Sequence, residues 1–123
     1  MRLLTIAQMQ KLLDNGSPEN YGKDHFPVVK LFLPGTACTW LLTEIDPEYH
    51  NIAFGLCDLG MGFPEIGPVD LDELLSIRVA KIFAVERDLF FNAKFPISVY
   101  ASAARDHEAI VEDETILARF VPK

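Results

Sequence analysis

The sequence predicts an α+β domain in which an antiparallel β meander, three strands plus a fourth, carries helices packed on one face. Three β-like runs follow one another with connections that are too short for a parallel crossover. Before and after these runs, apolar residues recur at helical spacing behind capping patterns. The length of 123 residues suits one domain over residues 1–123 with a single core.

The first predicted element is a helix over residues 5–15. Thr5 and Gln8 form a capping box, and the apolar residues that follow recur at the helical period. Asn15 and Gly16 are a typical helix stop. The polar, turn-rich residues that come next predict a loop over 17–26.

Three strands are predicted over residues 28–33, 39–45 and 52–59. The runs "VVKLFL", "TWLLTEI" and "IAFGLCDL" are rich in β-favouring residues, and "PGTAC" and "DPEYHN" between them are rich in turn formers. We expect the middle run to be the central strand of the meander.

A register with Leu33 opposite Thr39 and Ile45 opposite Ile52 sorts the meander into two faces. One face is apolar and predicts the core. The other has an aromatic and apolar centre with one charge of each sign; it includes Lys30, Phe32, Trp40, Glu44, Gly55 and Cys57. In this register Trp40 lies across from Gly55 and Cys57, and Lys30 lies diagonal to Glu44. This second face is either covered by the carboxyl-terminal segment or open to a partner, and we favour covering because Trp is usually buried.

The second half of the chain predicts a short helix and a fourth strand. Asp70 and Glu73 make a capping pattern before "LDELLSI", which fits a helix over 71–77. Imperfect alternation in "VERDLFF" predicts a strand over 85–91.

The remaining residues predict a third helix, followed by a tail that fits either a strand or a helix. Pro96 begins the helix "ISVYASAAR", with Ser98 as its candidate cap. The tail from Glu108 onward contains "TILARFV", which fits a strand or a helix.

The glycine-rich stretch over 58–67 raises the question of nucleotide binding. "GMGFPEIG" matches neither GxGxxG nor a Walker loop, and it lacks the βαβ context. It supplies Asp58 and Glu65, whose carboxylates repel a phosphate. We therefore expect a corner with glycines at positive φ, and no nucleotide or other cofactor.

The net charge of −7 is placed unevenly. No Lys or Arg occurs between Lys30 and Arg78. That stretch carries the acidic residues Glu44, Asp46, Glu48, Asp58, Glu65, Asp70, Asp72 and Glu73. Because nucleic-acid phosphates require a basic footprint, direct nucleic-acid binding is not expected. An acidic surface of this kind favours a basic protein partner.

Composition also bears on compartment and on metal binding. No apolar run reaches the length of a membrane span, and the amino terminus does not read as a signal peptide. Cys38 and Cys57 are expected to be reduced, buried thiols, so we predict a cytoplasmic protein without membrane attachment. The three histidines have no metal-ligand spacing, so no metal site is predicted. An apolar neighbour, Trp40, is expected to raise the pKa of Cys57.

Four sequence blocks resemble the bacterial domain-of-unknown-function family 2958: "VVKLFLPGTACTWLLTEIDPE", "FGLCDLGMGFPEIG", "ERDLFF" and a helix ending in "AAR". The resemblance covers about residues 27–105. It implies a small bacterial protein, often carried on plasmids and other mobile elements, with no assigned activity. "SIRVAKIFAV" lacks the Gly/Pro-rich connection expected there. The helix over 5–15 and an acidic carboxyl-terminal extension over 106–123 lie outside the shared block.

Two functions are compatible with these observations. The favoured one is a non-catalytic binding or accessory protein of a mobile element that acts through an acidic surface. Its expected contact residues are Glu44, Asp46, Glu48 and Glu65, joined by Phe32 and Trp40 if the second sheet face is open. The alternative is a small hydrolase-type or metal-dependent enzyme. It would use the carboxylates of Asp58, Glu65, Glu86 and Asp88.

Overall fold

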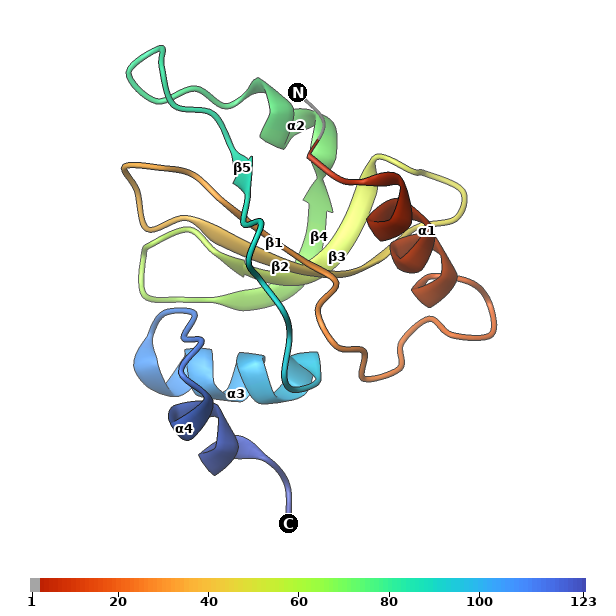
Figure 1. Cartoon of the computed structure of the whole chain (residues 1–123), viewed down its shortest axis with the longest axis vertical. Coiled ribbons are helices and arrows are strands. Elements are labelled where there is room, and N and C mark those ends of the chain that lie inside the picture. Colours follow the sequence, from red (N-terminus) through yellow and green to blue (C-terminus); the bar gives the residue numbers. More distant parts are fainter. Residues whose placement is uncertain (1–2) are drawn as a thin grey trace.

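A computed structural model describes residues 3–123 and has one antiparallel sheet with helices around it (Figure 1). In chain order the elements are α1 (Ile6–Asn15), β1 (Val29–Phe32), β2 (Thr39–Ile45), β3 (Ile52–Asp58), β4 (Glu65–Asp70), α2 (Leu71–Ser76), β5 (Glu86–Arg87), α3 (Ile97–His107), α4 (Glu114–Leu117) and the 3₁₀ helix η1 (Ala118–Phe120).

The sheet has the strand order β4-β3-β2-β1-β5, and every neighbouring pair is antiparallel. The predicted α+β class and antiparallel meander are therefore confirmed, with β2 in the centre. The predicted caps of the first two helices are confirmed as well. Thr5 and Gln8 form the reciprocal capping box of α1, and the Asp70 side chain accepts from the first backbone N–H groups of α2.

The fourth strand of the meander is β4, which the sequence did not predict. Gly67 and Pro68 lower the β propensity of this segment, yet all six residues of β4 pair with β3. The pairing overrides the local preference because β3 offers a complete row of backbone partners. Pro68 is tolerated since β4 is an edge strand.

The strand predicted over 85–91 is reduced to β5, which has two residues. Glu86 and Arg87 pair with β1, and the backbone N–H of Asp88 adds one more bond to the carbonyl of Lys30. The chain then leaves the sheet, and Phe90 is 94% exposed.

The predicted register is wrong by one residue between β1 and β2. Phe32, not Leu33, pairs with Thr39, because the turn is closed by a hydrogen bond from Leu33 N–H to the carbonyl of Cys38. Leu31 therefore lies opposite Trp40. This one-residue slip moves the aliphatic side chains of β1 onto the Trp40 face.

Between β2 and β3 the predicted register holds only for the first part of the strands. Trp40 pairs with Cys57 as predicted, but a bulge after Leu42 shifts the rest, so that Ile45 pairs with Ala53. At the bulge the backbones approach closely. A Cβ on Gly55 would lie 2.0 Å from the carbonyl oxygen of Leu41.

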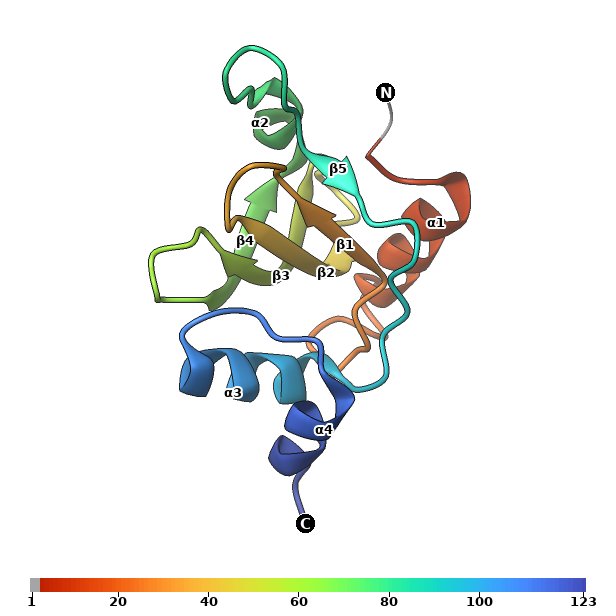
Figure 2. The same ribbon diagram turned by 60° about the vertical axis from the view of Figure 1, so that its left-hand side comes forward.

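Helices cover both faces of the sheet, not only one (Figures 1 and 2). Leu12 of α1 and Leu71 and Leu74 of α2 join the core cluster that contains Trp40. On the other face, Leu41 and Leu56 pack with α3 and with Leu117 of α4. Trp40 is thus covered, and by the amino-terminal elements and α2, since the carboxyl-terminal segment packs on the opposite face.

The carboxyl-terminal segment is helical. In "TILARFV" the structure has α4 followed by η1, and Leu117 is fully buried in the cluster that α3 forms with Leu41 and Leu56. Ser98 is not the cap of α3. Its backbone N–H and its hydroxyl instead donate to the side chain of Asp24, which reaches the helix start from the loop after α1.

Candidate functional site

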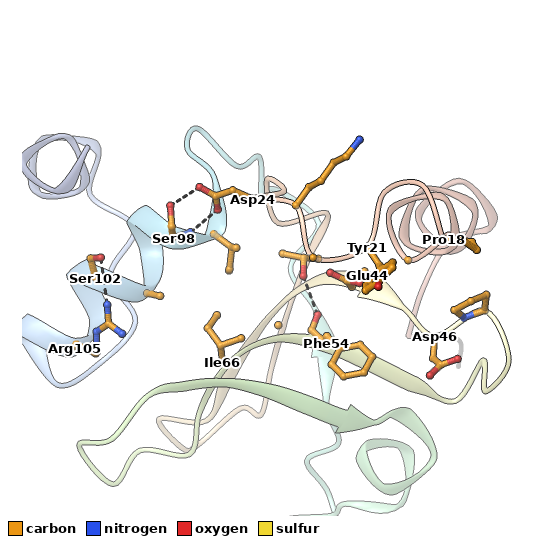
Figure 3. A pocket seen from close by; sticks show the side chains of 18 residues that line it. Pro18, Tyr21, Asp24, Glu44, Asp46, Phe54, Ile66, Ser98, Ser102 and Arg105 are labelled. Atoms are coloured by element: carbon orange, nitrogen blue, oxygen red, sulfur yellow. Dashed lines mark hydrogen bonds between the residues drawn. The ribbon is translucent and has the colours of Figure 1, made fainter. Parts of the chain in front are cut away.

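A groove of about 870 Å³ lies between α3, the sheet and the loop that follows α1 (Figure 3). Its floor is formed by β2, β3 and β4 and includes Glu44, Phe54 and Ile66. The loop from Gly16 to Asp24 forms the second wall. The lining is largely apolar, as is usual for ligand sites in proteins.

The wall made by α3 is one face of that helix. Ile97, Ser98, Ala101, Ser102 and Arg105 line the groove, at spacings of one, four, five and eight residues. Ala101 and Ser102 have small side chains, so the helix faces the sheet here without filling the space.

The opposite wall is fixed to the sheet by the end of α1. The buried Asn15 side chain donates to the carbonyl of Thr43 at 2.9 Å. Gly16 lies so close to β2 in space that a Cβ on it would be 2.0 Å from the carbonyl oxygen of Ile45. The bonds from Ser98 to Asp24 join this loop to α3, so both walls are held at a set distance.

Two of the predicted acidic residues line this groove. Glu44 and Asp46 are half-buried. Asp46 Oδ1 accepts from the backbone N–H groups of Glu48 (2.8 Å) and Tyr49 (3.2 Å), which fixes its carboxylate in the β2–β3 turn. Glu48 is exposed on the same turn. Within residues 3–123, no Lys, Arg or His nitrogen lies within 4.0 Å of these three carboxylates.

The groove lining also includes two basic side chains, one on α3 and one on the loop wall. Arg105 lies on α3, and its Nη2 is 3.5 Å from the Ser102 hydroxyl. In the part of the chain that the structure describes, Arg105 forms no ion pair. Lys23 donates to the side chain of Asn20 on the loop wall.

The other predicted contact residues lie away from the groove. Glu65 is exposed on the edge strand β4, and Phe32 is half-buried beneath Lys30, whose Nζ lies 5.8 Å from the ring centroid. Trp40 is only 4% exposed and belongs to the core, so it offers no contact surface.

The four carboxylates of the enzyme alternative do not meet. Glu65 and Glu86 lie on the two opposite edge strands of the sheet. Asp88 forms an ion pair with Lys30 at 3.3 Å. Asp58 is 3% exposed, and its carboxylate accepts from the backbone N–H groups of Gly60 (2.8 Å) and Ile110 (3.0 Å). This residue therefore holds the β3–β4 turn against the segment after α3.

The glycine-rich stretch turns a corner, as predicted. Gly60 and Gly62 have φ values of 78° and 86°, a region that glycine adopts without strain. The tip presents apolar side chains to solvent, with Met61 75% and Phe63 80% exposed.

Lys30 is not near Glu44, contrary to the predicted register. Its Nζ lies 2.7 Å from Glu112 and 3.3 Å from Asp88, so it joins β1 to the β5–α3 connection and to the tail. Burial alone lowers the pKa of Lys30, but the hydrogen bonds and charges of Glu112 and Asp88 outweigh it and raise this pKa. Burial raises the pKa of the Cys57 thiol from 9.0 to about 11, in the predicted direction.

Sequence reasoning missed Tyr21, Asp24 and Arg105, which complete the groove. Two of them lie in a loop and one on a helix, far apart in sequence from Glu44. The signal that could have found the wall is the run "ASAAR", in which Ala101, Ser102 and Arg105 share one face of the predicted helix.

Comparisons with known proteins identify a family and no assigned activity. No curated protein and no solved structure matched the chain. Within residues 3–123, no helix is long and apolar enough to cross a membrane, and no group of three His, Cys, Asp or Glu side chains is placed to hold a metal ion. The model of a family described as "Protein of unknown function (DUF2958)" matches residues 3–111. The match begins ahead of α1, so this helix is part of the family block, not an extension. The chain belongs to the DUF2958 family.

Proposed function

We propose that this protein is a non-catalytic binding protein that holds a basic segment of a protein partner in the groove between α3 and the sheet. The observation that carries this proposal is the placement of Glu44 and Asp46. Both residues are half-buried in the lining of a largely apolar groove, and in the described residues neither carboxylate has an ionic partner.

A Lys or Arg side chain matches this lining with both its aliphatic stem and its charged end. Its aliphatic stem packs on apolar surface, here offered by Phe54 and Tyr21, while its charged end stays near the open side. A carboxylate and a cation form a charge-assisted hydrogen bond, which contributes about 1.5–3 kcal/mol. The volume of about 870 Å³ accommodates several residues of a peptide.

The biological setting is also part of the proposal. We propose a role as an accessory protein of a bacterial mobile element, in the cytoplasm, which is supported by the family resemblance and by two thiols that are free. The net charge of −7 supports a basic partner over a nucleic acid. The enzyme alternative gains no support, because its four carboxylates do not meet. Glu65 and Glu86 lie on opposite edge strands, Asp88 is paired with Lys30, and Asp58 is buried at the end of β3.

The test is a pull-down from the native host with the wild-type protein and two charge-reversal variants. Glu44→Lys places a cation in the groove. Glu73→Lys makes the same charge change on an exposed position of α2, outside the groove lining. We expect Glu44→Lys to weaken binding of the captured partner by about ten-fold or more, the equivalent of one charge-assisted bond, and Glu73→Lys to leave it within about two-fold.

Salt provides a second readout. Raising the salt from 0.01 M to 0.1 M shortens the screening length from about 30 Å to about 10 Å, so an electrostatically held partner is released. The proposal fails if no protein is retained at either salt concentration. It also fails if Glu44→Lys and Glu73→Lys retain the same partner equally well.

A further inference from the structure

Besides Lys23, which is bound to Asn20, and Asp24, which is bound to Ser98, the groove lining has three charged side chains, and these are separated by sign. Glu44 and Asp46 lie toward one end, and Arg105 lies on α3 toward the other, with Ile66 and Phe54 between them (Figure 3). An occupant that matches the whole groove must therefore present a cation and an anion separated by an apolar stretch.

The guanidinium of Arg105 is open to an anion. Its one hydrogen bond within the described residues is the weak contact to the Ser102 hydroxyl at 3.5 Å. The acidic residues next to it are directed elsewhere. Asp106 lies 3.6 Å from His107, and the Glu108 carboxylate lies against the β3–β4 turn at Gly62. A planar guanidinium binds a carboxylate through two parallel N–H donors.

We propose that the groove binds the carboxyl terminus of its partner, with the terminal carboxylate at Arg105 and a Lys or Arg of the partner at Glu44 and Asp46. This inference rests on the proposed function and specifies how the partner is held. A partner that is basic overall has few acidic side chains to offer, but every protein chain carries one terminal carboxylate.

The α3 wall sets a minimum length for the segment, because Glu44 and Asp46 lie farther from Arg105 than Ser98 does (Figure 3). Ser98 and Arg105 are seven residues apart, which is about 10 Å along a helix. An extended chain covers about 3.3 Å per residue, so about three residues span this distance. The basic side chain should therefore stand three or more residues before the terminus, with apolar residues between them over Ile66 and Phe54.

The probe is the tightest-binding of three fluorescently labelled hexapeptides, which carry a lysine three, four or five residues before a terminal valine and apolar residues between them. It is compared with the same peptide carrying a terminal amide, and with an amidated peptide that has glutamate in the last position. We expect the free acid to bind at least ten-fold more tightly than the amide in a fluorescence polarisation titration at low salt.

Variants of the full chain test whether Arg105 causes the difference in affinity between the free acid and the amide. Arg105→Gln should bring the affinity for the free acid down to that for the amide, and Arg105→Lys should restore part of the gap. Arg119→Gln, an exposed arginine outside the groove, should leave the ten-fold gap unchanged. Glu44→Lys should weaken both peptides alike.

The inference is overturned if acid and amide bind equally, if neither binds, or if the glutamate amide binds as tightly as the free acid. It is also overturned if Arg105→Gln preserves the gap. In each of these cases the proposed function survives only if the host partner still distinguishes Glu44→Lys from Glu73→Lys. Failure of that pull-down refutes the proposed function itself.

Discussion

Replacing Asp58 tests the conclusion that its carboxylate holds the β3–β4 turn against the segment after α3. Asp58 is 3% exposed, and its two oxygens accept backbone N–H groups from Gly60 and from Ile110, which lies 52 positions further along the chain. A hydrogen bond to a charged group contributes about 1.5–3 kcal/mol to stability. Asp58→Ala removes both bonds and takes the acceptor away from the backbone N–H groups of Gly60 and Ile110.

The expected cost follows from these two bonds. Their gross loss is about 3–6 kcal/mol. Removing a buried charge returns part of this, because that charge no longer has to be desolvated. We expect Asp58→Ala to lower the free energy of unfolding by about 3 kcal/mol, and Asp58→Asn by about 2 kcal/mol, since Asn retains one acceptor oxygen.

The assay is urea denaturation followed by the fluorescence of Trp40, which is the single tryptophan and is buried. The slope of the transition should stay constant, so the shift in midpoint reports stability alone. Glu65→Gln, on an exposed position of the edge strand, is the control and should stay within about 0.5 kcal/mol of the wild type.

Amide hydrogen exchange gives a local readout of the same bond. The Ile110 N–H should lose protection in Asp58→Ala and keep it in Glu65→Gln. The reasoning is refuted if both Asp58 variants remain within about 0.5 kcal/mol of the wild type.

Two further predictions concern β3. A Cβ on Gly55 would lie 2.0 Å from the backbone oxygen of Leu41, so Gly55→Ala should destabilise the protein by about 3 kcal/mol in urea denaturation. Gly67→Ala, at the paired position on β4, meets nothing within 4 Å and should be near neutral; equal losses at both glycines would contradict the bulge geometry. The Cys57 thiol ionises near pH 9.0 when unfolded and near 11 when folded, so its stabilising contribution is present below pH 9 and is lost as the pH rises from 9 to 11. Over this pH interval the unfolding free energy of Cys57→Ala should fall less than that of the wild type. The pKa values of Lys30 and Tyr100 are also raised, but both groups are present in both proteins and their effect cancels in the comparison. Parallel curves would contradict the burial of the thiol.

The sequence by itself determined the elements whose signals are local. The capping box of α1 and the Asp70 cap of α2 depend on residues three apart, and the structure contains both. The antiparallel order of β1, β2 and β3 follows from connections that are too short for a crossover. The positive φ of Gly60 and Gly62 is likewise a local consequence of a tight turn.

Only the tertiary structure decided the features that depend on partners distant in sequence. The register of β1 on β2 is set by how the turn closes, and the bulge opposite Gly55 by how closely two backbones can approach. The strand β4 exists because β3 pairs with it, against its own propensity.

The groove belongs to this second class. Its walls are held by the bonds from Asn15 to Thr43 and from Ser98 to Asp24, across separations of 28 and 74 residues. The sequence identified Glu44 and Asp46 as acidic residues in a stretch without cations, but it did not bring Arg105 to the same groove. That placement requires the packing of α3 on the sheet, because a contact between distant segments depends on the whole fold and leaves no periodic signal in the sequence.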